Sequence, residues 1–152
     1  MQIIHHPVAE SAASAERVRI PVERLILAKR RWRGVAEDGR EFGFDLEQAL
    51  SDGAVVFAQD GVAYAVQQKA EPVLEVVVFG GLRGADAARL GWMIGNLHFP
   101  LGIDGDALHV ADDPALRQLF ERDGIAYTVC ERVFRPLSSG HFHSHADDHH
   151  QH

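Results

Sequence analysis

The chain has 152 residues, of which 46% are hydrophobic, enough for the core of one ordinary domain or of two small ones. Its 15 lysines and arginines stand against 22 aspartates and glutamates, giving a formal net charge of -7. A chain with this excess of negative charge is poorly suited to gripping phosphate backbones. We therefore expect no nucleic-acid partner.

The cysteine count and the length of the apolar runs indicate in which cellular compartment the protein works. Cys130 is the single cysteine, so no disulfide can form within the chain. The first ten residues lack the charged-then-apolar pattern of a signal peptide. Apolar runs such as residues 76–79 are far shorter than the roughly 20 residues that a spanning helix needs. We expect a cytoplasmic protein without a membrane segment.

Residues 17–68 alternate short apolar runs with turn signals, which is typical of an all-β domain. Asp-Gly pairs at 38–39, 52–53 and 60–61 predict tight turns, because glycine adopts positive φ without steric cost. Two predicted strands each place three apolar side chains on one face: Phe42, Phe44 and Leu46 in the first, and Val62, Tyr64 and Val66 in the second. We predict a small β-rich domain over residues 1–71.

From Pro72, which we read as part of a polar connection, the pattern changes. A β-branched run over 73–79 predicts a strand, and two short strands are expected at 101–103 and 107–110. Between them lies a helix whose apolar face is formed by residues spaced three or four apart: Ala87, Leu90, Ile94 and Leu97.

A second helix has clear end signals. Asp112 or Asp113 is suited to the N-cap, Pro114 to the first turn, and Gly124 to the position past the end. Its buried face is expected to consist of Leu116, Leu119 and Phe120, and residues 126–134 predict a closing strand. The order β-α-β-β-α-β is that of a ferredoxin-like domain, which we assign to residues 72–136. The predicted fold class is α+β.

Residues 137–152 hold too little apolar surface to repay the entropy of ordering, and we predict a flexible tail. Six of the 10 histidines of the chain lie in this tail: His141, His143, His145, His149, His150 and His152. Neutral imidazole is a good ligand for Ni²⁺, Zn²⁺, Cu²⁺ and Co²⁺. A purification tag would bind the same ions, but such a tag is normally an uninterrupted histidine run. The tail is therefore predicted to bind metal.

Three further residues are candidates for chemistry. His98, at the end of the first helix, is on residue chemistry alone better explained as a capping residue. His109 should point away from the face of Leu108 and Val110, satisfied or solvent-facing. Cys130 is expected in the core. A metal-dependent hydrolase using Cys130 and histidines is one alternative, but no paired carboxylates and no HExxH motif support it, and we expect no enzyme.

The segment 17–33 is rich in arginine around one tryptophan. It could hold an acidic partner, or it could be a strand with a basic polar face. Because the chain as a whole is acidic, a protein partner is favoured over RNA. The candidate partner-binding residues are Arg30, Arg31, Trp32 and Arg33.

The motif Gly95-Asn96-Leu97-His98-Phe99-Pro100-Leu101, the following helix rich in aspartate and leucine, and the histidine tail together resemble the urease accessory protein UreE family. The resemblance spans nearly the whole chain, including residues 30–34 and 38–42. It implies a β-rich first domain likened to a peptide-binding module and a ferredoxin-like second domain that forms a homodimer. It also implies that His98 binds metal at the dimer two-fold, which replaces the capping interpretation.

The resemblance further implies a nickel metallochaperone that passes Ni²⁺ to the urease GTPase accessory protein and the apo-urease assembly complex. Zn²⁺, Cu²⁺ or Co²⁺ would bind the same sites. Some members carry a His-x-His pair near the second helix, whereas this chain has His109 alone, which we keep as a candidate auxiliary ligand. The alternative function is a nickel or zinc buffer that uses only the tail, with the folded part as an anchor.

Overall fold

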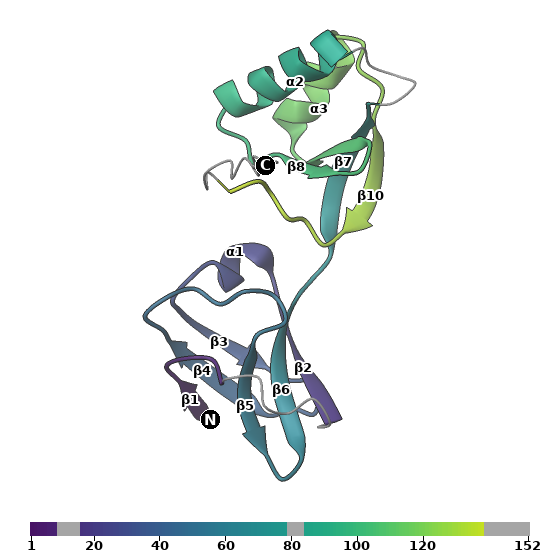
Figure 1. Cartoon of the computed structure of the whole chain (residues 1–152). Helices are drawn as coiled ribbons and strands as arrows, with labels where there is room; N and C mark the ends of the chain where they lie inside the picture. The colour runs from purple at the N-terminus through teal and green to yellow at the C-terminus, as the bar shows by residue number, and fades with distance from the viewer. Residues whose placement is uncertain (9–15, 79–83, 139–152) are drawn as a thin grey trace, which may run out of the picture. The chain divides into compact units, whose positions relative to one another are not determined.

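The computed structural model describes residues 1–8, 16–78 and 84–138 of the chain. The chain divides into two compact units, one of Met1–Val73 with Val129–Phe134 and the other of Leu74–Thr128 with the residues from Arg135 onward. Strands and helices are mixed, which confirms the α+β class (Figure 1). Among the described helices, none is both long enough and apolar enough to cross a membrane. The predicted domain boundaries after residues 71 and 136 stay predictions.

The first unit is built on two three-stranded sheets. One has the order β1-β4-β3 and consists of β1 (Gln2–Ile4), β4 (Glu41–Asp45) and β3 (Arg31–Val35). The other has the order β2-β6-β5 and consists of β2 (Glu16–Val22), β6 (Val62–Gln68) and β5 (Val55–Gln59). The Asp-Gly turns hold as predicted, with positive φ at Gly39, Gly53 and Gly61.

The core of the first unit lies between the apolar faces predicted from sequence. Phe42, Phe44, Leu46, Tyr64 and Val66 are buried, and Val62 packs against them half-buried. Trp32 stacks on Phe44 with ring centroids 3.7 Å apart. Gly34 has to be small here, because a Cβ at this position would lie 2.9 Å from both Ile20 and Trp32 side-chain atoms.

Arg40, in the turn between β3 and β4, packs against aromatic rings of β5 and β6. The Arg40 guanidinium carbon lies 4.3 Å from the Phe57 ring centroid and 5.3 Å from that of Tyr64. The Tyr64 hydroxyl donates to Asp38 Oδ2 at 2.6 Å, and the Arg40 backbone N–H donates to Asp38 Oδ1 at 3.0 Å. The Tyr64 bond, followed by the Arg40 backbone bond, lowers the pKa of Asp38.

The arginine-rich segment is not one strand, and the first unit is not all-β. A short helix, α1 (Arg24–Leu27), separates β2 from β3. Its turn forms because the Ile26 and Leu27 amides both donate to the Glu23 carbonyl, at 3.0 and 2.8 Å. This turn buries Leu27 in the core while Leu25 remains exposed, a result that an extended strand with strict alternation would not give.

The second half contains β7 (Glu71–Val77), α2 (Gly84–Asn96), β8 (Gly102–Asp104), β9 (Ala107–Ala111), α3 (Pro114–Arg122) and β10 (Thr128–Arg132). The four strands form one sheet in the order β10-β7-β9-β8. Pro72 lies inside β7 and not in a connection before it. Proline is tolerated there because it stands at the start of the strand, where a missing amide hydrogen costs least.

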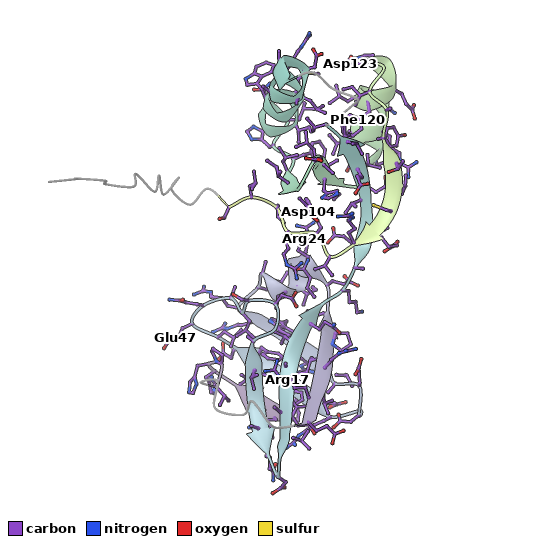
Figure 2. All side chains as sticks on the ribbon, turned by 45° about the vertical axis from the view of Figure 1, so that its right-hand side comes forward. Arg17, Arg24, Glu47, Asp104, Phe120 and Asp123 are labelled. Atoms are coloured by element: carbon purple, nitrogen blue, oxygen red, sulfur yellow. The ribbon has the colours of Figure 1, made fainter. Side chains whose placement is uncertain are left out.

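The core of the second unit forms where α2 and α3 cover one face of this sheet (Figure 1). The buried face of α3 is the predicted one, with Leu116, Leu119 and Phe120, the last visible inside the unit in Figure 2. On α2, Leu90 and Ile94 are buried as predicted. Leu97 is instead 49% exposed, because the helix ends at Asn96, before this residue.

The ends of α3 follow the predicted chemistry. Asp113 is the N-cap, and its carboxylate accepts from the Ala115 amide at 2.8 Å. Gly124 follows the helix with a φ of 66°. Arg117 reaches back to Asp112 with two bonds of 2.6 and 2.7 Å, and these bonds lower the pKa of that carboxyl.

We predict that Tyr64→Phe raises the pKa of Asp38 and destabilises the protein in a pH-dependent way. A lowered carboxyl pKa stabilises the fold above the unfolded-state value of about 3.9, and this stabilisation is lost as the pH falls through the folded-state pKa. The variant should therefore be less stable than wild type at pH 7, with a smaller difference at pH 3. Carboxyl NMR titration and urea unfolding at both pH values test this. Tyr127→Phe is the control, because it removes a hydroxyl that donates to a different carboxylate, that of Glu121, at 3.0 Å. If Tyr64→Phe lowered the stability by the same amount at pH 7 and at pH 3, the assignment of the pH dependence to Asp38 would be refuted.

Candidate metal centre

His98 follows α2 closely and reverses the chain with a left-handed backbone. Its φ is 62°, a value that residues other than glycine adopt infrequently. The His98 amide donates to the Gly95 carbonyl at 2.9 Å, and the Phe99 amide donates to the Ile94 carbonyl at 3.2 Å. Together these bonds form a Schellman motif, in which glycine is the usual residue at the left-handed position. The chain thus carries an imidazole where the backbone favours glycine.

The His98 side chain is open to solvent. Among the residues that the structure describes, its imidazole makes no hydrogen bond and no ion pair. The imidazole therefore makes no capping hydrogen bond, and the helix end is closed by the backbone amides of His98 and Phe99, which donate to the Gly95 and Ile94 carbonyls. A strained backbone that holds an accessible, unpartnered imidazole is a reason to look for a function at this residue.

A shallow groove lies between α2 and α3, and two of its lining residues, Asn96 and Leu97, directly precede His98 in the sequence. It has a volume of about 570 Å³ and is lined by Trp92, Met93, Asn96, Leu97, Ala115, Gln118, Leu119 and Arg122. Trp92 is 67% exposed and Leu97 is 49% exposed, which makes an apolar surface of the kind that marks interaction sites. Sequence reasoning missed this groove. The residue that could have revealed the groove in the sequence is Trp92, a large apolar side chain on the side of the helix opposite Leu90 and Ile94.

His109 occupies a different environment. It lies in β9, is only 5% exposed, and its Nε2 is 2.8 Å from Glu75 Oε2 on β7. Of the two predicted states, satisfied or solvent-facing, the structure shows the satisfied one. Because Glu75 bonds Nε2, only Nδ1 of this buried ring could bind an ion, and no group of three possible ligands surrounds it among the described residues. The auxiliary role of His109 therefore stays a prediction.

The other predicted ligands are either outside the described residues or dispersed. The tail histidines His141, His143, His145, His149, His150 and His152 all lie outside the described residues. Within residues 1–8, 16–78 and 84–138, no group of three histidine, cysteine, aspartate or glutamate side chains could hold a metal ion. Within the described part of one chain, His98 thus belongs to no group of three such side chains.

The last residues to be placed are two exposed histidines, His5 and His6, and the cysteine. His5 Nδ1 is 3.0 Å from the Asp45 carbonyl oxygen, and His6 Nδ1 is 3.3 Å from that of Pro7. Cys130 lies half-buried in β10 between exposed neighbours, whereas the sequence places it in the core. The expectation fails because β10 exposes Val129 while its alternate residues are only partly covered.

The basic segment divides into surface and core. Arg30, Arg31 and Arg33 are exposed, and Arg31 donates through Nε to Asp45 Oδ1 at 2.7 Å. Trp32 is buried against Phe44, and its indole N–H finds no hydrogen-bond partner in the described part of the chain. Of the four candidate partner-binding residues, only the arginines present side chains to the surface.

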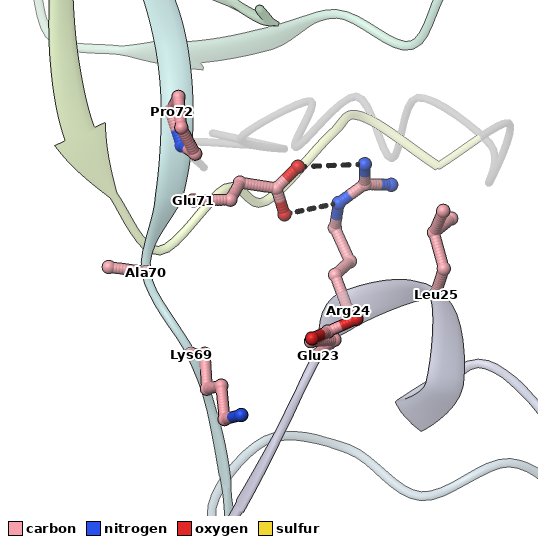
Figure 3. A pocket seen from close by; sticks show the side chains of 7 residues that line it. All are labelled: Glu23, Arg24, Leu25, Lys69, Ala70, Glu71 and Pro72. Carbon is pink, nitrogen blue, oxygen red and sulfur yellow. Dashed lines mark hydrogen bonds and ion pairs between the residues drawn. The ribbon is translucent and has the colours of Figure 1, made fainter.

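A separate pocket of about 310 Å³ lies in the first unit between α1 and the start of β7 (Figure 3). Arg24 donates through Nε and Nη2 to the two Glu71 carboxylate oxygens, at 2.8 and 3.0 Å. The Arg24 guanidinium carbon also lies 4.8 Å from the Phe134 ring centroid. Both charges of this partly buried pair are satisfied. The pair therefore holds α1 to the start of β7 and supplies no open metal ligand.

Comparison with known proteins identifies relatives over most of the chain. A family model described as "UreE urease accessory protein, C-terminal domain" matches residues 71–152. A "Urease accessory protein UreE" of Azorhizobium caulinodans is 33% identical over 132 residues, covering 80% of this chain and 62% of that protein. The protein of the same name from Paracoccus denitrificans is 36% identical over 122 residues, covering 79% and 72%.

A third relative covers nearly the whole of this sequence. The UreE of Ectopseudomonas mendocina is 30% identical over 153 residues, which covers 99% of this chain and 89% of that protein. The matches confirm the resemblance predicted from the motif around His98. The relatives are by name accessory proteins of urease and not enzymes, in agreement with the prediction made for this chain. The chain belongs to the UreE urease accessory protein family.

Proposed function

We propose that this chain is a nickel metallochaperone that binds Ni²⁺ as cargo through His98 and delivers it during urease maturation. The observation that carries the proposal is the exposed imidazole of His98, held by a left-handed backbone and left unpartnered by the described residues. Imidazole nitrogen is a suitable ligand for Ni²⁺. Affinity order alone would favour Cu²⁺, and the choice of nickel depends on the family.

The architecture that fits this role has a β-rich first domain, a ferredoxin-like second domain and a flexible histidine tail. The order β10-β7-β9-β8, with two helices on one face, supports a ferredoxin-like fold for residues 72–136. The first domain would comprise residues 1–71, and the tail residues 137–152. The tail histidines would then be mobile ligands attached to a rigid site.

A homodimer would supply the ligands that one chain lacks. One imidazole makes a poor site, but a two-fold axis near His98 would bring two together. The exposed surface of Trp92 and Leu97, next to His98 in the chain, is apolar area that a second copy would cover. Tail imidazoles would complete the coordination at the high effective concentration that tethering provides.

Release is as important as binding for a carrier. A closed thiolate site suits permanent structural metal, whereas a nitrogen-rich site with incomplete coordination permits transfer. The proposed acceptors are the urease GTPase accessory protein and the apo-urease assembly complex. We place the transfer in the cytoplasm, where the single thiol, Cys130, would stay reduced.

The decisive experiment is a nickel titration of the chain truncated after Ser139, followed by calorimetry and light scattering at neutral pH. We expect a dimer that binds one Ni²⁺. His98→Asn should form the same dimer and bind none, because asparagine tolerates the left-handed backbone but removes the imidazole. His5→Asn, at another exposed histidine, is the matched control and should bind like the parent.

The same titration decides between this proposal and the alternative. If the truncated chain and its His98→Asn variant bind nickel equally, His98 is not the ligand and the proposal fails. If neither binds while the full chain does, the protein is a tail-based nickel or zinc buffer.

His98→Gly should make the metal-free protein more stable while abolishing nickel binding by the truncated chain. Glycine removes the strain of a left-handed backbone, which for other residues is roughly 1 kcal/mol. We expect the free energy of unfolding in urea to rise by up to about that amount. A decrease in stability would show that the His98 side chain makes structural contacts, and would weaken the argument that it is kept for binding.

Nickel should dissociate on acidification. An imidazole must be unprotonated to bind a metal, and an ordinary histidine has a pKa of about 6.5. We expect nickel loaded at pH 7.5 to be lost between pH 6.5 and about pH 5, as measured by dialysis against buffered solutions and metal analysis. Full retention at pH 5 would exclude ligation dominated by imidazole.

A further inference from the structure

The last described segment of the chain is bonded to the connection that follows His98. The Leu137 amide donates to the Leu101 carbonyl at 2.7 Å. Both residues belong to the second unit, and Leu101 directly precedes β8. The segment that follows β10 therefore ends beside the start of β8 (Figure 1). The histidine-rich residues begin only a few positions later.

The attachment is made by the backbone and not by the side chain. Leu137 is 62% exposed, so burial of its side chain contributes little to holding it in place. Pro136 has no amide hydrogen to donate, and Ser138 makes no hydrogen bond to another described residue. The Leu137 amide is therefore the group by which residues 136–138 are attached.

The acceptor carbonyl belongs to a well-packed part of the second unit. Leu101 is half-buried against the core, and its Cδ2 lies 3.8 Å from the position that a Cβ at Gly91 of α2 would take. Phe99 packs against the same core. Leu101 follows His98 by three positions, so the two backbones are at most about 11 Å apart. The bond thus holds Leu137 a short distance from His98.

We propose that the hydrogen bond from Leu137 to Leu101 anchors the start of the histidine tail near His98 and so favours the proximal tail histidines over the distal ones as partners of His98 on nickel. The proximal histidines are His141, His143 and His145, and the distal ones are His149, His150 and His152. The inference rests on the proposed function, in which tail imidazoles complete the nickel site. It adds Leu137 as a positioning residue that acts through the tail.

The number of residues between the anchor and each histidine decides the preference. His141 follows Leu137 by four positions and His149 by 12. Four residues span up to about 14 Å, which together with the imidazole side chains covers the distance to His98. The effective concentration of a tethered ligand falls roughly as the −3/2 power of the tether length, so His149 would be present at about one fifth of the concentration of His141.

Amide hydrogen exchange tests the anchor without any metal. In the full-length, metal-free protein, the Leu137 amide should exchange about three- to tenfold more slowly than the Ser138 amide, relative to their intrinsic rates, because only the former is bonded. Leu137→Ala keeps the amide and should keep this protection. Equal protection of the two amides, measured by NMR, would show that the anchor does not form in solution and would overturn the proposal.

Nickel affinity tests the preference between the two halves of the tail. It is measured for the full chain by competition with a chelator at neutral pH. Asparagine at the three proximal positions should weaken the affinity about fivefold, because the nearest remaining tail imidazole is then that of His149. Asparagine at the three distal positions is the matched comparison and should weaken it less, by no more than about twofold. Equal losses with the two triple variants would refute the preference.

Two changes of the tether separate its length from its composition. Leu137→Pro removes the anchoring amide and should weaken nickel binding by the full chain about twofold or more, while Ser138→Pro keeps that amide and should not. A Gly-Ser insert between Ser139 and Gly140 that makes the tether to His141 about fourfold longer should weaken binding about eightfold. The same insert placed after His152 leaves the tether unchanged and is the control.

The chain truncated after Ser139 shows whether Leu137 acts through the tail. Its nickel affinity should be the same with and without Leu137→Pro, since it carries no tail imidazole. An equal loss in the truncated and the full chain would mean that the substitution disturbs the folded site, and would overturn the positioning role. The exchange measurement contains no metal, so it can fail while His98→Asn still abolishes nickel binding, which separates failure of the anchor from failure of the nickel proposal.

Discussion

After α2 the chain has to turn back so that β8 can pair with β9, and this reversal depends on the left-handed backbone of His98. The turn bonds the Gly95 and Ile94 carbonyls and lets Phe99 pack against the core that contains Ile94. It also ends the helix early enough to leave Leu97 outside. This one backbone conformation therefore directs Phe99 toward the core of the second unit. It also exposes the imidazole of His98 and leaves an apolar groove beside it.

Local signals made much of the second unit predictable. The cap at Asp113, Pro114 in the first turn and Gly124 past the end act within a few residues of chain, so the bounds and buried face of α3 could be inferred from sequence. The same applies to the Asp-Gly turns of the first unit. Leu97 was misplaced because the periodicity continues beyond the point where the Schellman turn stops the helix, and α1 was missed because one helical turn has no periodicity to detect.

The candidate site was harder to predict because it depends on contacts between distant residues. Residue chemistry favoured a capping role for His98, and only the family motif pointed to a ligand. The bond between His109 and Glu75 joins residues 34 positions apart on β7 and β9, and nothing near His109 in the sequence indicates it. The bond from Leu137 to Leu101 likewise joins residues that lie far apart in the sequence. Tertiary pairing, and not local propensity, decided these features.

The conformation at residue 98 also bears on how the family could diverge. Selection for stability alone would replace histidine by glycine here, since glycine adopts the left-handed backbone freely. If His98 binds metal as proposed, a lineage that stopped carrying metal would no longer be selected to keep histidine here, and one substitution would make its fold more stable. Under the same proposal, the residue at this position would be an evolutionary marker that separates relatives selected for metal binding from relatives selected for the stability of the fold alone.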